Sequence, residues 1–321
     1  MNRRQPVARH VGAMPPAMRA FWSMALALVV VAPWFGGAFV LHLAVLSCLN
    51  VVIVTGLALI SRAGQLSLGH AAFMAVGAYA SVLMDRYLGI GFWLSAGAGI
   101  LTTVIVAGAL GWAILRLRGV YFVLVTFAFG ELTRLALLDW ADVTGGANGI
   151  TNIAPIQIFS LALDSRPKFY ILAVAVALLS VWILHVLFKR PLGHALDAVA
   201  ENPTLAESTG LSVFRLQLVA FVGGCALAAL GGILQARYIG YVSPESFNAG
   251  VSIGFIIMLV IGGCSSVLGP LIGALVLTPL PEFFRGAVQT QHVFYGAALI
   301  LILRFMPGGL VSLGGQARWQ R

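Results

Sequence analysis

Charged side chains are scarce in this chain. Only 9% of its 321 residues are Asp, Glu, Lys or Arg, whereas 60% are hydrophobic, and the mean hydropathy is +0.99. An ordinary soluble domain carries about 25% charged residues. The composition therefore excludes a soluble globular protein and predicts an all-α polytopic membrane protein.

Motifs for catalysis and nucleotide binding are missing. The sequence has no GxxxxGK[ST] phosphate loop, no HExxH and no GxGxxG that opens a helix after a strand. A serine hydrolase fits poorly, because Ser67 stands between leucines and not in a G-x-S-x-G motif. We predict that the chain is not an enzyme, has no catalytic residue and holds no cofactor. If ATP powers it, other subunits bind the ATP.

Cysteine is also rare. Cys48, Cys225 and Cys264 all lie in apolar runs, with no CxxC pair and no His or acidic residue at ligand spacing. We predict that they are small core residues and that the chain has no metal site.

Basic residues exceed acidic ones, with a net charge of +9. They cluster at the ends of apolar runs, as the positive-inside rule explains, so we predict contact with a lipid bilayer and no binding of nucleic acid. Most of them, including Arg62, Arg116 and Lys189, fall on the side of the termini if the number of spans is even. This predicts a multi-pass membrane protein with both termini in the cytoplasm.

Long apolar runs fill the rest of the chain. A helix needs about 20 apolar residues to cross a bilayer, which predicts about ten spans, with a range of about eight to ten. They make a membrane domain of residues 21–307, between a tail of residues 1–20 and another of residues 308–321. The predicted spans are residues 21–40, 41–60, 65–84, 92–115, 120–139, 169–188, 214–236, 249–264, 268–284 and 292–306. Gly269 and Pro270 are the reason for dividing residues 249–284 into two helices.

Residues 189–211 form a polar island between two apolar runs, within a connection of residues 189–213 that we place in the cytoplasm. Leu192, Leu196 and Val199 recur at helical spacing and predict an apolar stripe on one short helix. Asn202 before a proline predicts a helix N-cap, and Gly210 predicts the end of a second short helix.

Five polar residues lie in or at the edge of predicted spans, where each needs a partner or a water-filled cavity. Gln65, Ser67 and His70 open one span, and Glu131 and Arg134 stand three residues apart in another. One interpretation is that they line or gate a translocation path. The alternative is that the first three are hydrogen-bonding groups between helices and the last two are a structural ion pair.

Five stretches together resemble the permease subunits of branched-chain amino acid ABC transporters, in particular the LivM-type half. They are GQLSLGHAAFMAVGAYA, LRLRGVYFVLVTFAFGELTRL followed by TGGANGI, AENPTLAESTGL leading into VAFVGGCALAALGGIL, YVSPESF, and VIGGCSSVLGPLIGALV. The resemblance runs from about residue 42 to residue 313. It implies the permease subunit of an importer in the bacterial inner membrane for branched-chain or related amino acids, with the substrate itself left open.

The resemblance also implies partners. They are a homologous second permease of the LivH type, two cytoplasmic ABC ATPases that bind ATP, and a periplasmic substrate-binding protein. The polar island resembles the coupling loop that docks on the ATPase. The residues that match the family there are Glu201, Asn202, Ala206, Glu207 and Gly210, beside Leu196 and Val199 of the apolar stripe, which we expect to enter a groove of the ATPase.

The chain departs from the family at several positions. Relatives usually carry arginines in the first coupling helix where this chain has Asp197 and Ala200, and Cys264 and Ser265 stand where GGLGS is commoner. From Asp197 we expect an ATPase surface with less acidic character. The alternative function is an ion-coupled secondary transporter or channel, which needs buried acids along an ion route; Glu131 is the one clear intramembrane acid.

Overall fold

The computed structural model describes residues 36–283, except 118, 159, 160 and 265, together with residues 296 and 310. Side chains of residues 158, 161, 162, 282 and 283 are also outside the description. The predicted tails and the predicted span 292–306 therefore lie outside the described residues, apart from the two isolated positions, as does most of the predicted span 21–40.

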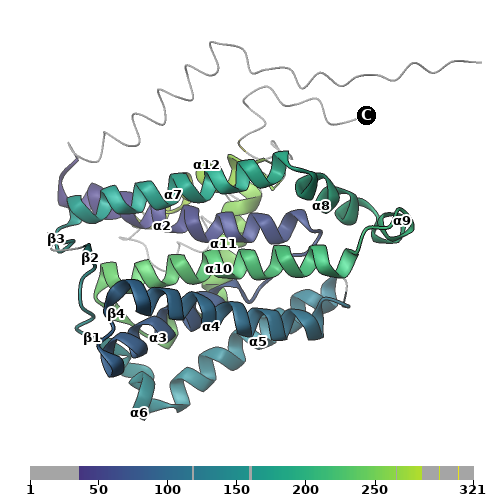
Figure 1. The fold of residues 1–321 in the computed structure, drawn as a ribbon. Coiled ribbons are helices and arrows are strands. Elements are labelled where there is room, and N and C mark those ends of the chain that lie inside the picture. Colours follow the sequence, from purple (N-terminus) through teal and green to yellow (C-terminus); the bar gives the residue numbers. More distant parts are fainter. Residues whose placement is uncertain are drawn as a thin grey trace, which may run out of the picture.

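The described chain is a bundle of helices (Figure 1). Its long helices are α2 (Gly37–Arg62), α3 (His70–Leu88), α4 (Gly91–Ile114), α5 (Val120–Asp139), α7 (Arg166–Lys189) and α10 (Val213–Ile239). Shorter ones are α6 (Ala141–Thr144), α8 (Pro191–Glu201), α9 (Pro203–Ser208), α11 (Ala249–Gly262), α12 (Gly269–Leu277), α13 (Leu280–Phe283), η1 (Gly146–Asn148) and η2 (Pro244–Phe247).

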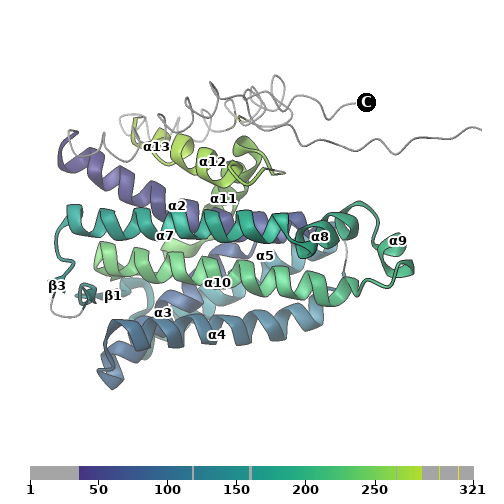
Figure 2. The ribbon, with the colours of Figure 1, turned by 45° about the horizontal axis from the view of Figure 1, so that its top comes forward.

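Strands are few and very short in this part of the chain. β1 (Ile150–Thr151) pairs with β4 (Tyr241–Val242), and β2 (Gln157–Ile158) pairs with β3 (Leu161–Ala162), both antiparallel. All four lie at one end of the bundle, whereas α8 and α9 lie at the other (Figures 1 and 2). We call these the strand end and the module end.

The predicted fold class, an all-α membrane bundle, is confirmed. Among the described residues, six helical stretches are long and apolar enough to cross a membrane: Gly37–Arg62, Gly91–Ile114, Val120–Asp139, Arg166–Lys189, Val213–Ile239 and Pro244–Gly262. The division of residues 249–284 is also confirmed, because α11 ends at Gly262 and α12 begins at Gly269. The predicted boundary between residues 40 and 41 is wrong, since α2 already begins at Gly37.

Helix α2 lies in the middle of the bundle, with α10, α7, α11 and α12 packed around it (Figures 1 and 2). Most of its length is buried inside the described chain. Its tightest neighbour is α10, and the two backbones meet where Gly56 faces Gly224. Of the three free cysteines, Cys48 and Cys225 are buried in the core, as predicted, whereas Cys264 is only partly buried.

The predicted span 65–84 begins later than expected, because α3 starts at His70 and residues 65–69 are not helical. A backbone N–H group of this segment and one in the first turn of α3 find partners on other helices instead. Leu68 N–H donates to Thr126 Oγ1 of α5 at 3.1 Å, and Ala71 N–H donates to Ser252 Oγ of α11 at 3.0 Å. Irregular backbone is stable inside a membrane protein when protein groups satisfy it in this way.

Candidate functional site

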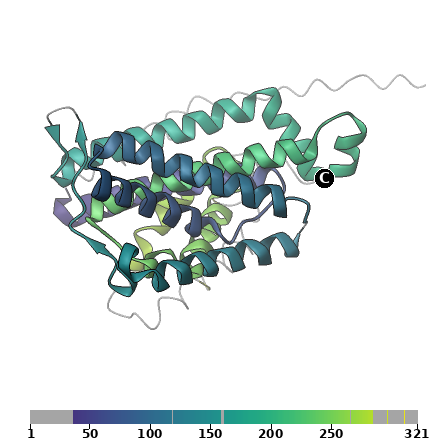
Figure 3. The ribbon, with the colours of Figure 1, turned by 60° about the horizontal axis from the view of Figure 1, so that its bottom comes forward.

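Helices α8 and α9, the two-helix module, project from the module end of the bundle (Figure 3). Both predicted caps of its second helix are present. Asn202 Oδ1 accepts the Leu205 N–H at 3.1 Å, and Gly210 has a φ of +87°, which favours glycine. The N–H groups of Gly210 and Leu211 then close the helix on the carbonyls of Glu207 and Ala206, at 2.9 and 3.1 Å. The module is therefore a folded unit with fixed ends.

The apolar stripe of the module is already covered by this chain. Leu196 and Val199 of α8 are each 1% exposed and Ala206 of α9 is 3% exposed. Val199 and Ala206 pack with Val213 at the start of α10. These three predicted site residues therefore fasten the module to the bundle, and the stripe is not free to enter a partner's groove.

A different set of side chains is exposed on the module. Glu201, Asn202, Glu207 and Gly210, all predicted site residues, are open to solvent, and so is Leu205, which is 62% exposed. Sequence reasoning missed Leu205, although a leucine outside the apolar stripe of a polar island is a usable signal. Acidic groups around an exposed leucine make a surface suited to a partner protein.

An ion pair joins the module to α2. Arg62 donates from Nε and Nη2 to the two carboxylate oxygens of Asp197, at 2.6 and 2.7 Å. The guanidinium carbon of Arg62 also lies 3.8 Å from the ring centroid of Phe188, near the end of α7. Asp197, which we expected to face an ATPase, therefore has its carboxylate engaged inside the chain.

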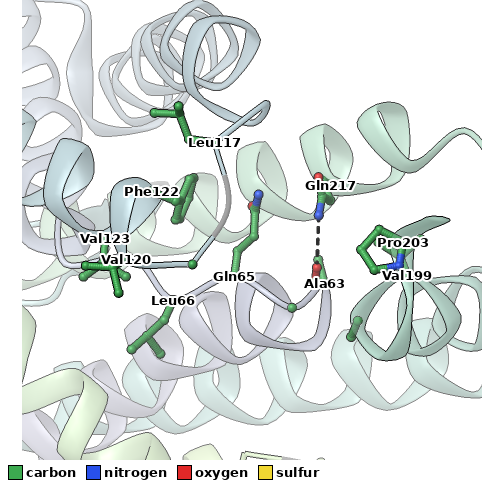
Figure 4. Close-up of a pocket in the computed structure, with 13 residues that line it drawn as sticks. Ala63, Gln65, Leu66, Leu117, Val120, Phe122, Val123, Val199, Pro203 and Gln217 are labelled. Carbon is green, nitrogen blue, oxygen red and sulfur yellow. Dashed lines mark hydrogen bonds between the residues drawn. The ribbon is translucent and has the colours of Figure 1, made fainter.

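A cavity of about 400 Å³ lies where the module meets the bundle (Figure 4). Its walls come from the α2–α3 and α4–α5 connections, from the first turn of α5, and from α8, α9 and α10. Figure 4 shows the Gln65 amide between Phe122 and Gln217, and Gln217 Nε2 donates to Ala63 O at 3.4 Å. Val199 and Pro203 of the module form the opposite wall. A movement of the module would therefore reshape a space that Gln65 shares.

Gln65, Ser67 and His70 are all buried, at 7%, 0% and 0% exposure. His70 Nε2 contacts Ile53 O of α2 at 3.0 Å, which fits the interpretation as a bond between helices. Yet Gln65 Oε1, Ser67 Oγ and His70 Nδ1 have no hydrogen-bond partner within the described part of the chain. Buried polar atoms are normally satisfied, so these three atoms need a partner that the described residues do not supply. Their role in a path stays a prediction.

Glu131 and Arg134 form the predicted pair on α5, with Arg134 Nε 3.0 Å from Glu131 Oε2. A third member was missed: Arg134 Nη1 lies 2.8 Å from Glu245 Oε1 of η2. Glu245 is 111 residues away in sequence, so no local spacing could have found it. The structure does not bring this cluster together with the module, because Glu245 belongs to the strand end.

Residues 39–303 match the model of a family described as "Branched-chain amino acid transport system / permease component". The chain belongs to this family. The matched range contains the two-helix module, the cavity and all five candidate path residues.

Two relatives in the family show where the chain lies within it. It is 30% identical over 312 residues to the high-affinity branched-chain amino acid permease protein LivM of Escherichia coli K12, covering 90% of this chain and 73% of that protein. It is 27% identical over 271 residues to LivH of Salmonella typhimurium, covering 78% of this chain and 86% of that protein. No solved structure matches the chain.

Proposed function

We propose that this chain is the LivM-type permease subunit of an ATP-binding-cassette importer, and that it carries branched-chain or related amino acids across the bacterial inner membrane. The observation that carries the proposal is the folded module with an exposed acidic and apolar surface, at one end of a bundle of this family. The module end is then the cytoplasmic side, where that surface docks on an ATPase. Both termini lie on the same side.

The proposal includes four further subunits. A LivH-type permease pairs with this chain, two ABC ATPases bind and hydrolyse ATP, and a periplasmic binding protein delivers the substrate. The likeness of this chain to both LivM and LivH supports a pair of related permeases. The missing phosphate loop supports separate ATPase subunits.

The exposed charges on α5 support a partner in the membrane. The side chains of Glu131 and Arg134 remain 30% and 21% exposed within this chain. Ionisable groups inside a membrane avoid lipid and face protein or a water-filled cavity. The second permease therefore covers this side of α5, and substrate passes between the two bundles. ATP-driven movement of the module then alternates access to that path.

Loss of the ATPase is expected to abolish uptake. Cells that express the complete system, tested with a panel of labelled branched-chain and related amino acids, should accumulate substrate only when the cognate ATPase is present and competent to hydrolyse ATP. Collapse of the proton gradient at constant ATP should leave initial uptake unchanged. Transport that survives loss of the ATPase and fails on collapse of the gradient would instead establish the ion-coupled alternative.

Glu207→Ala is expected to disconnect uptake from ATP hydrolysis while the protein still folds and inserts. Glu207 is exposed, and truncation of a central interface side chain costs about 2 kcal/mol or more, so the ATPase should bind on the order of 30-fold more weakly. Co-purification of the ATPase and uptake in proteoliposomes measure the effect. Asp142→Ala, which removes an exposed acid at the opposite end, is the matched control. Normal uptake with Glu207→Ala would remove Glu207 from the interface.

A further inference from the structure

The contact between Arg62 and Asp197 fixes the relative orientation of the two side chains as well as the distance between them. Two parallel hydrogen bonds, of 2.6 and 2.7 Å, join the guanidinium to both carboxylate oxygens. The side chain of Arg62 is only 17% exposed, and its guanidinium lies over the Phe188 ring. A two-pronged Arg–carboxylate pair is stronger and more specific than a single contact between charges, and a stacked ring holds the plane of the guanidinium.

The three residues come from three elements that meet at the module end. Arg62 is the last residue of α2, Phe188 is near the end of α7, and Asp197 is in the middle of α8. Because α2 is the most deeply buried of the candidate spans, a force on Asp197 reaches the centre of the bundle through one side chain.

Backbone contact reinforces the same junction. A Cβ added to Gly64 would lie 3.1 Å from the Ala200 Cα of α8, so the helix rests directly on the α2–α3 connection. This connection leads within a few residues to Gln65, Ser67 and the start of α3. The module thus touches the segment that leads to the buried polar atoms for which the described residues supply no partner.

The other attachments of α8 are different in kind. Leu196 and Val199 are held by apolar packing, which has no preferred direction. The ion pair is the contact of α8 that sets its orientation on α2.

We infer that Arg62 and Asp197 are positioning residues that lock the coupling helix α8 to α2, so that movement of the docked ATPase is passed to the centre of the membrane bundle. This inference rests on the proposed function. Asp197 then acts within the permease and not on the surface of the ATPase, and its acidity says nothing about the charge of that surface.

The test uses the complete importer, with both permeases, the ATPases and the binding protein, reconstituted in proteoliposomes. The readout is the amount of substrate transported per ATP hydrolysed, with assembly followed by co-purification of the ATPase. Asp197→Asn and Arg62→Gln should each lower this ratio about fivefold or more while the ATPase remains bound. Together they should have no greater effect than either alone, because both break one contact.

Two further variants separate orientation from charge. Arg62→Lys keeps the charge without the two-pronged contact and should give an intermediate ratio. Exchange of the two residues, Arg62→Asp with Asp197→Arg, should recover most of the ratio lost in the single variants. His194→Gln changes an exposed residue of the same helix and is the matched control, with an unchanged ratio expected.

The outcomes are distinct. If the wild-type complex shows no ATP-dependent uptake, the proposed function itself is refuted. With wild-type uptake present, a normal ratio in Asp197→Asn would overturn the inference. So would an effect of Asp197→Asn that Arg62→Gln does not share, since Asp197 would then act on the ATPase directly. If a single variant fails to accumulate, the exchange variant decides: a near-normal ratio supports the pair, and a low ratio with normal accumulation contradicts it.

Discussion

Replacing Gly224 with leucine is expected to abolish accumulation of the protein in the membrane. A Cβ at this position would overlap the carbonyl oxygen of Gly56 on α2 and lie 2.6 Å from Ile60 Cγ1. The crossing is reciprocal, because a Cβ on Gly56 would overlap the carbonyl oxygen of Gly224. Helices in membranes associate largely through such close packing of small residues, so separating α10 from α2 opens the core of the bundle. Protein yield in isolated membranes and the unfolding temperature in detergent measure the loss.

Gly108→Leu is the matched control for this prediction. Gly108 is also in the interior of a long helix, α4, but a Cβ there would meet no atom within 4 Å. The two variants add the same side chain, so helix propensity and hydrophobicity change equally and only the packing differs. Yields that fall equally in both, or in neither, would contradict the assignment of the crossing between α2 and α10.

Hydropathy predicted most of the fold because lipid restricts the backbone conformations that an apolar run can adopt. A run of about 20 apolar residues has to be helical to satisfy its backbone, so the positions of α4, α5, α7 and α10 follow from composition alone. The same rule failed between α2 and α3. There Thr126 satisfies the Leu68 N–H of the irregular segment, and Ser252 satisfies the Ala71 N–H in the first turn of α3; these partners lie 58 and 181 residues away from the groups they bind.

Local signals also predicted the two-helix module, but not which of its faces is free. Asn202 and Gly210 act within a few residues of their own positions, so their capping roles were readable from sequence. The stripe of Leu196 and Val199 was equally visible, yet amphipathic spacing does not say whether the bundle or a partner covers it. The structure shows that this chain covers it: Val199 packs with Val213, and Leu196 belongs to the main core of the bundle.

The ion pairs show most clearly which contacts cannot be predicted from the sequence. Glu131 and Arg134 are one helical turn apart and were predicted to meet, whereas Arg62 and Asp197 are 135 residues apart. Nothing in the spacing of Arg62 and Asp197 links them, so Asp197 looked like a charge turned toward a partner. Tertiary structure was needed to find its true neighbour.

Arg237→Met is expected to destabilise the strand end of the bundle by about 3–5 kcal/mol, the usual cost of removing one partner from a buried ion pair. The Arg237 side chain is 1% exposed, and its Nη1 lies 2.7 Å from Asp85 Oδ2. It also donates to Ala154 O at 3.0 Å and to Ser95 Oγ at 3.3 Å. One side chain of α10 therefore ties together α3, α4 and the loop before β2. Loss of a large part of a typical stability of about 5–15 kcal/mol should appear as a lower unfolding temperature and a reduced yield.

A second substitution separates the charge from the packing. Most of the cost of Arg237→Met comes from leaving the Asp85 carboxylate, which is 19% exposed, without its partner. Replacing both residues, with Asp85→Leu added to Arg237→Met, should therefore recover most of the lost stability. Lys168→Met is the control, because its pair with Asp164 is 3.2 Å long and exposed on both sides, and such pairs contribute about 0–1 kcal/mol. If the double variant is no more stable than Arg237→Met, the hydrogen bonds to Ala154 and Ser95, and not the ion pair, hold this end of the bundle together.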